Sequence, residues 1–243
     1  MAEFSNTTSK AGLLQRAEDF SLLGDGGITN DATLKAKFTN WINEGNGIVQ
    51  LAIMRADKYW KFDDANFSNF PIATIDLVSG QRDYTLPAAT VSGNPSTLYR
   101  ANRFRVKDTS ANWQVLDLLD PTEEESVENG MPTKYRLLGN SVRLSDIPLT
   151  GAVTLTGGLE VQFQRGPDQF VIGDTTQQPS FIDTYHYLLP LYASAQYFMP
   201  SDMNRAQQYL AKFNTDLLAC VADSARRNGE IPSRLGTVEQ NNE

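Results

Sequence analysis

The sequence has 243 residues, of which 40% are hydrophobic, and a formal net charge of −8. This apolar content excludes a disordered chain, and the length suffices for one large domain or for two units that share a core. No apolar run reaches the roughly eighteen residues of a membrane span, and the N-terminus lacks the pattern of a signal peptide. We therefore expect a soluble protein that does not contact a membrane.

The single cysteine excludes an internal disulfide and a Cys-rich metal site, which indicates a reducing compartment. The negative charge argues against nonspecific nucleic-acid binding as the main activity, because phosphate binding depends on Lys and Arg. It is compatible with a protein that surrounds DNA, because an acidic wall lets a polyanion slide past without sticking. It is equally the charge of a soluble protein with no such role.

The start of the chain is predicted to be helical after a frayed end. Residues 1–9 are expected to be frayed, and residues 11–22 are predicted to form a short helix that ends at a glycine-rich turn. Residues 29–31, Thr-Asn-Asp, offer caps for a second helix, which the Gly-Asn-Gly of residues 45–47 should break. Residues 48–60 carry the pattern of a third helix.

After residue 66 the hydrophobic period changes to two, which is typical of strands. Turn residues divide this stretch into hairpins and single strands, and Gly139 and Asn140 supply the positive φ angles of one tight turn. The predicted pairs are 72–78 with 82–87, 99–107 with 113–119, and 135–138 with 142–144, followed by strands at 153–155 and 159–164.

The C-terminal part carries two apolar stripes with the spacing of helix faces. Pro190 lies inside the first predicted helix and is expected to kink it. Residues 200–202, Pro-Ser-Asp, end this helix and start the next. The first stripe is Phe181, Tyr185, Leu188, Tyr192, Ala195 and Met199, and the second is Ala206, Leu210, Phe213, Leu217, Cys220 and Ser224.

These patterns predict an α+β fold, in which a helical bundle formed by the N- and C-terminal segments carries an inserted antiparallel β-rich subdomain. The bundle is expected because both C-terminal helices are too apolar on one face to stand alone. The predicted parts are N-terminal helical segments at 1–66, a β-rich insertion with hairpins at 67–179, a C-terminal helical pair at 180–229 that shares the core with 1–66, and an extended tail at 230–243.

No set of residues forms a recognisable catalytic constellation. His186 is the only histidine, which excludes a His-pair metal site, and it lacks the partners that a general base needs. Cys220 falls on an apolar stripe, which favours packing over nucleophilic chemistry. We expect no catalytic, cofactor-binding or metal residues and no enzyme activity, although perturbed acid/base pairs can be hidden in a sequence.

Basic residues gather on one face of the predicted strand 99–107, which is either an ordinary solvent-exposed face or an interface with an acidic partner. Three consecutive glutamates at a predicted helix start would supply that acidic surface on a neighbouring copy. The candidate subunit-interface residues are Arg103, Arg105, Lys107, Glu123, Glu124 and Glu125.

Several motifs follow one another in a fixed order over about residues 48–227. They are Tyr-Thr-Leu-Pro at 84–87, the basic strand 99–107 with its return strand from Trp113, Met-Pro-Thr-Lys-Tyr at 131–135, the turn at 139–140, Val-Arg-Leu at 142–144, Pro148, Gly-Pro at 166–167, Pro179, and an aromatic helix that reaches Leu-Tyr-Ala-Ser-Ala at 191–195. This order resembles the head-to-tail adaptor (connector) proteins of tailed bacteriophages, of the tubular tail protein A type.

The resemblance implies a non-enzymatic virion protein of the neck between capsid and tail, made in the host cytoplasm. In that family about a dozen copies form a ring beneath the portal, extend the DNA channel and dock the next tail component. The implied partners are the portal protein, a downstream tail or nozzle protein, copies of the chain itself (a dodecamer), and double-stranded DNA that passes without sequence-specific binding. No cofactor is implied.

In the same family a C-terminal extension commonly grips the portal. By position alone, residues 231–235 are the candidate gripping segment of this chain, and they are expected to become ordered on assembly. Arg226 and Arg227 also have a local explanation, because cations stabilise a helix C-terminus. The candidate portal-interface residues are Arg226, Arg227, Ile231, Arg234 and Leu235.

The alternative function is a tail or baseplate binding module that recognises a carbohydrate or a protein through its β-rich insertion. Trp60, Tyr84, Tyr99 and Trp113 distinguish the two hypotheses. An exposed patch of these aromatic residues would favour a binding module, and buried aromatic residues would disfavour it.

Overall fold

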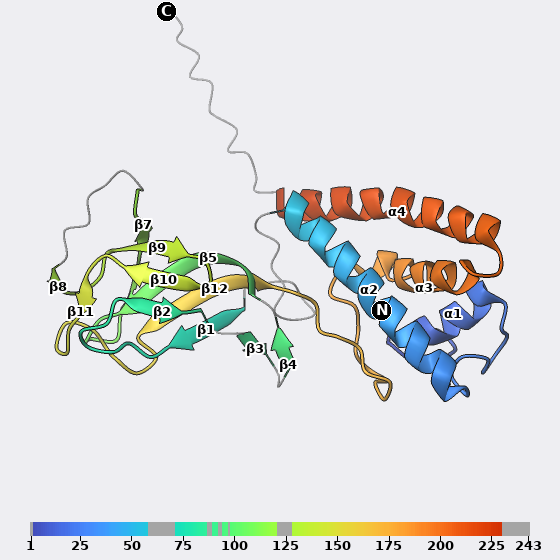
Figure 1. Ribbon diagram of the computed structural model, residues 1–243, viewed down its shortest axis with the longest axis horizontal. Helices are drawn as coiled ribbons and strands as arrows, with labels where there is room; N and C mark the ends of the chain where they lie inside the picture. Colours follow the sequence, from blue (N-terminus) through green and yellow to red (C-terminus); the bar gives the residue numbers. More distant parts are fainter. Residues whose placement is uncertain are drawn as a thin grey trace, which may run out of the picture. The chain divides into compact units, whose positions relative to one another are not determined.

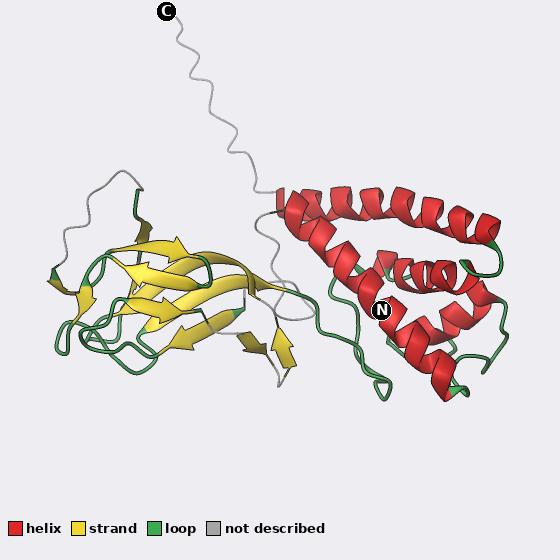
Figure 2. Ribbon diagram, viewed as in Figure 1, coloured by secondary structure: helices red, strands yellow, loops and turns green. Residues whose placement is uncertain are grey.

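The computed structural model describes residues 2–57, 71–86, 89–91, 94–96, 98–120 and 128–229. The chain forms two compact units, a helical unit from Met1–Trp60 with Gln169–Glu243 and a β unit from Lys61–Asp168. Helices make up the first and strands the second (Figures 1 and 2). The predicted α+β fold is confirmed, because the helices come from both ends of the chain and the strands from between them.

The helical unit is organised around one helix, α3, that is buried over most of its length. Its elements are α1 (Leu13–Ser21), α2 (Ala32–Ala56), the 3-10 helix η1 (Asp183–Tyr185), α3 (Leu188–Phe198) and α4 (Met203–Gly229). α3 packs against α1, α2 and α4 (Figure 1), which explains why its sequence is apolar all round. No helix in the described ranges is long and apolar enough to cross a membrane.

α2 continues through residues 45–47 without a break, so the prediction of two separate helices is wrong. Asp31 caps its start by accepting hydrogen bonds of 2.8 and 2.9 Å from backbone N–H groups of the first turn. Beyond the two glycines, Val49 and Ile53 are fully buried. Burial of this face stabilises the helix by more than the glycines cost it locally.

α3 begins at Leu188, later than predicted, so Pro190 lies in its first turn. The N–H groups of a first turn have no intrahelical partner, and a proline there removes no hydrogen bond. The predicted kink is therefore wrong, and the chain before α3 forms η1 instead.

α4 confirms the predicted second stripe. Asp202 caps the helix by accepting a 3.1 Å hydrogen bond from the N–H of Arg205, as the Pro-Ser-Asp corner suggests. The ring of Phe213 lies 5.2 Å from that of Tyr192 on α3, centroid to centroid. Among the stripe residues, Ala206, Phe213, Cys220 and Ser224 are buried, and Leu210 and Leu217 are half-buried.

The first residues form an N-terminal strap (residues 2–6) that packs into the helical unit, so the prediction of a frayed end is wrong. Phe4 is fully buried, and its N–H donates to the carbonyl of Gln177 at 2.8 Å. The Ala2 N–H donates to Nδ1 of His186 at 3.4 Å. These partners lie far away in the sequence, where a local pattern cannot reveal them.

The β unit contains two four-stranded sheets. The first has the order β1-β12-β5-β6 and the second β2-β10-β9-β7, and β3 (Ala89–Val91) with β4 (Asn94–Ser96) and β8 (Asn129–Gly130) with β11 (Ile147–Pro148) form two-stranded pairs. Pairing is antiparallel except between β7 and β9 and between β8 and β11. The sheet strands are β1 (Ile72–Ile75), β2 (Asp83–Thr85), β5 (Leu98–Lys107), β6 (Trp113–Val115), β7 (Asp117–Leu118), β9 (Lys134–Leu138), β10 (Ser141–Leu144) and β12 (Leu159–Arg165).

Two of the predicted strand pairs are confirmed and one is wrong. β9 and β10 form the tight hairpin, with Gly139 at φ 60°, and β6 returns along β5. β1 and β2 do not pair with each other, because β1 pairs with β12 and β2 with β10. The predicted strand 113–119 divides into β6 and β7 in different sheets, and the predicted strand 153–155 makes only isolated bridges at Val153.

The core of the β unit lies between the two sheets. Phe104 and Val106 of β5 point inward and are fully buried, and the ring of Phe104 lies 4.4 Å from that of Tyr135 on β9, centroid to centroid. Val142 and Leu144 of β10 enter the same cluster. Alternation along β5 therefore directs its basic residues to the outer face of the first sheet.

Candidate interaction surfaces

The basic strand face, Arg103, Arg105 and Lys107 on β5, is largely occupied by local partners. Nε of Arg105 donates to Oε1 of Glu160 at 2.7 Å, and Glu160 lies directly opposite on β12. The Arg105 guanidinium and the Lys107 ammonium lie 5.5 and 5.6 Å from the ring centroid of Trp113 on β6. Arg103 is exposed and makes no ion pair within the described part of the chain. Of the three cations on this face, it is the one whose position the local contacts explain least.

Most of the other predicted interface residues are not described by the structure. Arg226 is exposed near the end of α4, with its guanidinium 3.9 Å from the carboxylate of Asp223 on the same helix. Outside the described residues lie Glu123, Glu124, Glu125, Ile231, Arg234 and Leu235, together with the side chain of Arg227.

The four aromatic residues that distinguish a binding module do not form one exposed patch. Tyr84 is buried, and its hydroxyl donates to the carbonyl of Gln81 at 2.7 Å. Tyr99 is exposed, Trp113 is half-buried beside the two cations, and Trp60 lies outside the described residues.

His186 and Cys220 are both buried in the helical unit. Nε2 of His186 lies 2.8 Å from the carbonyl of Phe181 and donates to it, since Nδ1 accepts from the N-terminal strap. Burial lowers the pKa of His186 and raises the pKa of the Cys220 thiol to about 12. No group of three or more His, Cys, Asp or Glu side chains gathers as a metal site within the described ranges.

Two tyrosine–aspartate pairs fasten the segment before α3 to α4. The Tyr187 hydroxyl donates to Asp216 at 2.8 Å, and Lys212 donates to the same carboxylate at 2.9 Å. Burial and the neighbouring Asp216 carboxylate raise the pKa of Tyr187 to about 12. Tyr185 bonds Asp223 in the same way. The aspartates are seven residues apart, which is two helical turns, so their common face on α4 could have been found in the sequence.

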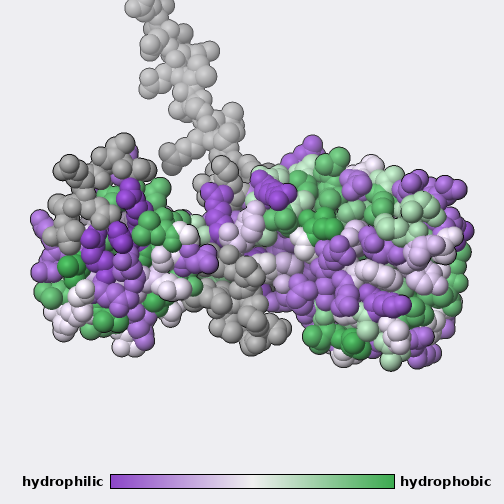
Figure 3. Space-filling model, viewed as in Figure 1, coloured by the Kyte–Doolittle hydropathy of each residue, from purple (hydrophilic) through white to green (hydrophobic). Residues whose placement is uncertain are grey.

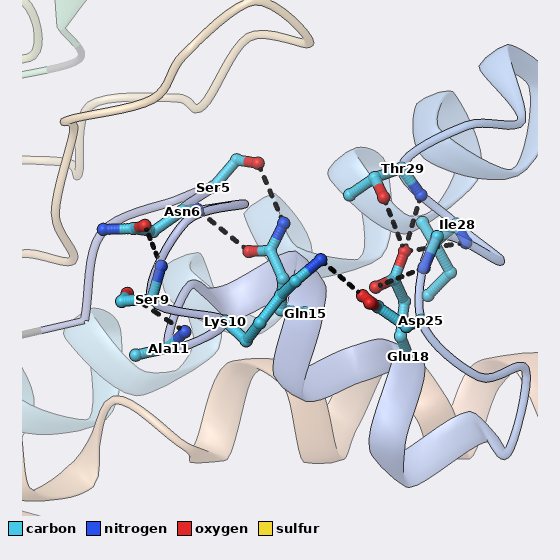
Figure 4. A network of polar contacts seen from close by, with 11 residues as sticks. Ser5, Asn6, Ser9, Lys10, Ala11, Gln15, Glu18, Asp25, Ile28 and Thr29 are labelled. Carbon is cyan, nitrogen blue, oxygen red and sulfur yellow. Dashed lines mark hydrogen bonds and ion pairs between the residues drawn. The ribbon is translucent and has the colours of Figure 1, made fainter.

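Glu18 organises the loop between α1 and α2 (Figure 4). One carboxylate oxygen accepts from the N–H of Ile28, the N–H of Thr29 and the hydroxyl of Thr29 at 2.7 to 3.0 Å. The other oxygen accepts from the N–H of Gly26 at 3.1 Å. The carboxylate is buried and satisfied by these four donors, so it holds the loop and is not available to a ligand.

A groove of about 350 Å³ lies between α2 and α3. Its half-buried Trp41 and Tyr197 make it apolar, with Lys37 exposed at the rim. On the face shown in Figure 3, hydrophobic and hydrophilic side chains are interspersed over the helical unit. The groove is lined by Leu34, Lys37, Asn40, Trp41, Gln196, Tyr197 and Pro200, and exposed large hydrophobic side chains of this unit include Leu22, Ile48, Met199, Met203 and Leu218.

A comparison with protein-family models finds a match that covers nearly the whole chain. The family model described as SU10 adaptor protein matches residues 8–234, which covers almost all of both units. No curated protein matches the chain.

Proposed function

This chain belongs to the SU10 adaptor protein family of phage head-tail adaptors, and from that premise we propose that it forms a ring beneath the portal. The family is one of structural virion proteins and not of enzymes, and the prediction of a phage adaptor is confirmed at that level. The proposed ring extends the DNA channel of the neck and docks the next tail component. Its partners are the portal protein, a downstream tail or nozzle protein, and about a dozen copies of the chain.

The observation that carries this proposal is the extent of the family match. Residues 8–234 include every α-helix and strand of the described part of the chain, so the match covers elements of both units. Two units of different architecture also suit a protein that must bind different neighbours, because each unit offers its own surface. The net charge of −8 suits a conduit through which double-stranded DNA passes without sequence-specific binding.

The proposed contact between neighbouring copies uses the basic strand face. A ring needs two different, complementary surfaces on each subunit. Arg103 is the exposed cation of this face, and Glu123, Glu124 and Glu125 of the next copy would supply the opposite charge. Such a contact between exposed charges should weaken as the salt concentration rises.

The proposed contact with the portal uses the end of α4 and the tail that follows it. Arg226 is exposed at this end, and residues 230–243 carry no apolar periodicity that would require burial in the helical unit. Arg227, Ile231, Arg234 and Leu235 would complete the contact. A tail used in this way can bind a partner without disturbing the helices.

Native mass spectrometry of this chain mixed with the portal protein of the same genome tests the proposal. We expect a discrete complex with many copies of each protein, whose mass gives the number of subunits. A chain that stays monomeric beside an unbound portal would contradict the ring.

A truncated variant that ends after Gly229 tests the proposed contact between the tail and the portal. It should keep the melting temperature of the full chain and lose most of its affinity for the portal. A large fall in melting temperature would instead assign the tail to the fold.

A further inference from the structure

The middle of α2 contains residues of low helix propensity, and the packing around the helix explains only some of them. Gly45 has a packing reason, because an added Cβ would lie 3.1 Å from the ring of Tyr192. Gly47 has none, because an added Cβ there would meet no described atom within 4 Å. A glycine inside a helix lowers helix formation about fivefold relative to alanine. The chain therefore carries a weak position at Gly47 that this conformation does not require.

Asn46, between the two glycines, adds a second unfavourable feature. Its side chain is 0% exposed, and neither Oδ1 nor Nδ2 has a hydrogen-bond partner in the described structure. A buried amide without partners is rare in native proteins, because it gives up its hydrogen bonds to water and gains none in return. Any conformation that releases Asn46 would recover these hydrogen bonds.

The half of α2 before this point is fixed to the chain that precedes α3. Asn43 forms two hydrogen bonds with the backbone of Phe170, at 2.8 and 3.0 Å. In the half after it, Val49 and Ile53 are fully buried, and the buried Gln50 also has a polar partner. A helix that opened at the weak position would therefore keep its first half in place.

We propose that α2 contains a hinge at Asn46 and Gly47, where the helix can end and its last turns can reorient. Asn-Gly is a common helix ending, because glycine adopts the left-handed conformation that closes a helix. In the open conformation Gly47 takes this position, Asn46 reaches solvent, and residues 48–56 move as a separate segment. The continuous helix is the major state of the isolated chain, and the open helix is a minor state.

A hinge at this position would allow the end of α2 to adapt when the chain joins an assembly. This use rests on the proposed function, but the hinge itself does not. Conflict between local sequence preference and the folded structure is expected at sites that change conformation, because the sequence must serve both states.

Hydrogen exchange on the isolated full-length chain tests the hinge directly. Opening at Gly47 breaks the bonds that the N–H groups of residues 48–51 donate to the turn before them. We expect these amides to be protected at least about tenfold less than those of residues 38–42 in the same helix. Equal protection along the whole of α2 would overturn the proposal.

The variant Gly47→Ala provides the second arm, because its added Cβ meets no described atom. It should raise the protection of residues 48–51 about fivefold. Asn214→Ala, at an exposed position of α4, is the matched control and should leave these amides unchanged. If Gly47→Ala left them unchanged too, the hinge would be wrong.

The outcome is independent of the portal experiment. Reduced protection at residues 48–51 without any portal complex would support the hinge and contradict the ring. A portal complex together with uniform protection of α2 would support the ring and contradict the hinge.

Discussion

Phe4 stacks on Phe170, with ring centroids 4.8 Å apart and an interplanar angle of 12°. This pair joins the N-terminal strap to the loop before α3, and Phe4 is fully buried. Phe4→Ala should therefore lower the free energy of unfolding by about 3–5 kcal/mol, as removal of a core phenylalanine does. Urea denaturation measures the change, and the exposed Thr7→Ala is the control. A change near zero for Phe4→Ala would show that the strap does not dock.

His186 should make the stability fall in mild acid. Burial lowers its pKa below the ordinary value of 6.5, so the unfolded chain takes up a proton at a higher pH than the folded chain. This contribution to stability is complete above pH 6.5 and is lost as the pH falls toward the folded pKa.

The variant His186→Gln isolates this effect, because the glutamine cannot titrate. The difference in unfolding free energy between wild type and variant should shrink between pH 7 and pH 5, by at most about 1.4 kcal/mol per pH unit. A difference that does not depend on pH would mean that His186 is accessible to protons in the folded state.

Leu22 occupies a position that suits glycine. It follows the last residue of α1 with φ 58°, and its N–H and that of Leu23 close the helix end onto the carbonyls of Asp19 and Glu18. Because its side chain is 69% exposed, Leu22→Gly loses little packing and should stabilise the chain by up to about 1 kcal/mol.

Leu218 is the matched control for this substitution, because it is 73% exposed but lies inside α4. Leu218→Gly should destabilise the chain by about 1 kcal/mol. Thermal denaturation should show a higher melting temperature for Leu22→Gly and a lower one for Leu218→Gly. Changes of the same sign in both variants would contradict the argument from backbone conformation.

Cys220 should be unreactive in the folded protein. Burial raises the pKa of its thiol to about 12, and the thiolate is the reactive form. At pH 8 a thiol reagent should modify the native chain at least about a hundredfold more slowly than the chain in urea. Fast labelling of the native chain would show that this part of α4 opens readily.

Charge reversal at Arg103 tests the contact between copies. Arg103→Glu should weaken the proposed ring by about 1 kcal/mol per contact, whereas Arg103→Lys keeps the charge and should assemble normally. Sedimentation at low and high salt compares the variants. If Arg103→Glu assembled like the wild type, the ring contact would have to lie elsewhere.

The sequence predicts elements whose evidence is local. The stripe of α4 and the Gly139-Asn140 hairpin follow from spacing and turn chemistry within a few residues, and both are confirmed. The basic strand face likewise follows from alternation along one strand.

The features that sequence reasoning missed depend on distant partners. β1 pairs with β12 and not with its neighbour β2, because the packing between sheets decides the pairing. The partners of Arg105 and Lys107 follow from the register of β5 with β12 and β6. The continuity of α2 depends on the burial of Val49 and Ile53 against other helices.

The insertion of the β unit between α2 and α3 also determines the order in which the parts can fold during translation. β12 ends at Arg165, so every described strand of the β unit is synthesised before α3. α1 and α2 are made first, yet the buried helix α3, on which both pack, is made only after the β unit. The apolar faces of α1 and α2 that pack on α3 therefore stay uncovered in the nascent chain until α3 is made, and such exposed surface is what chaperones bind.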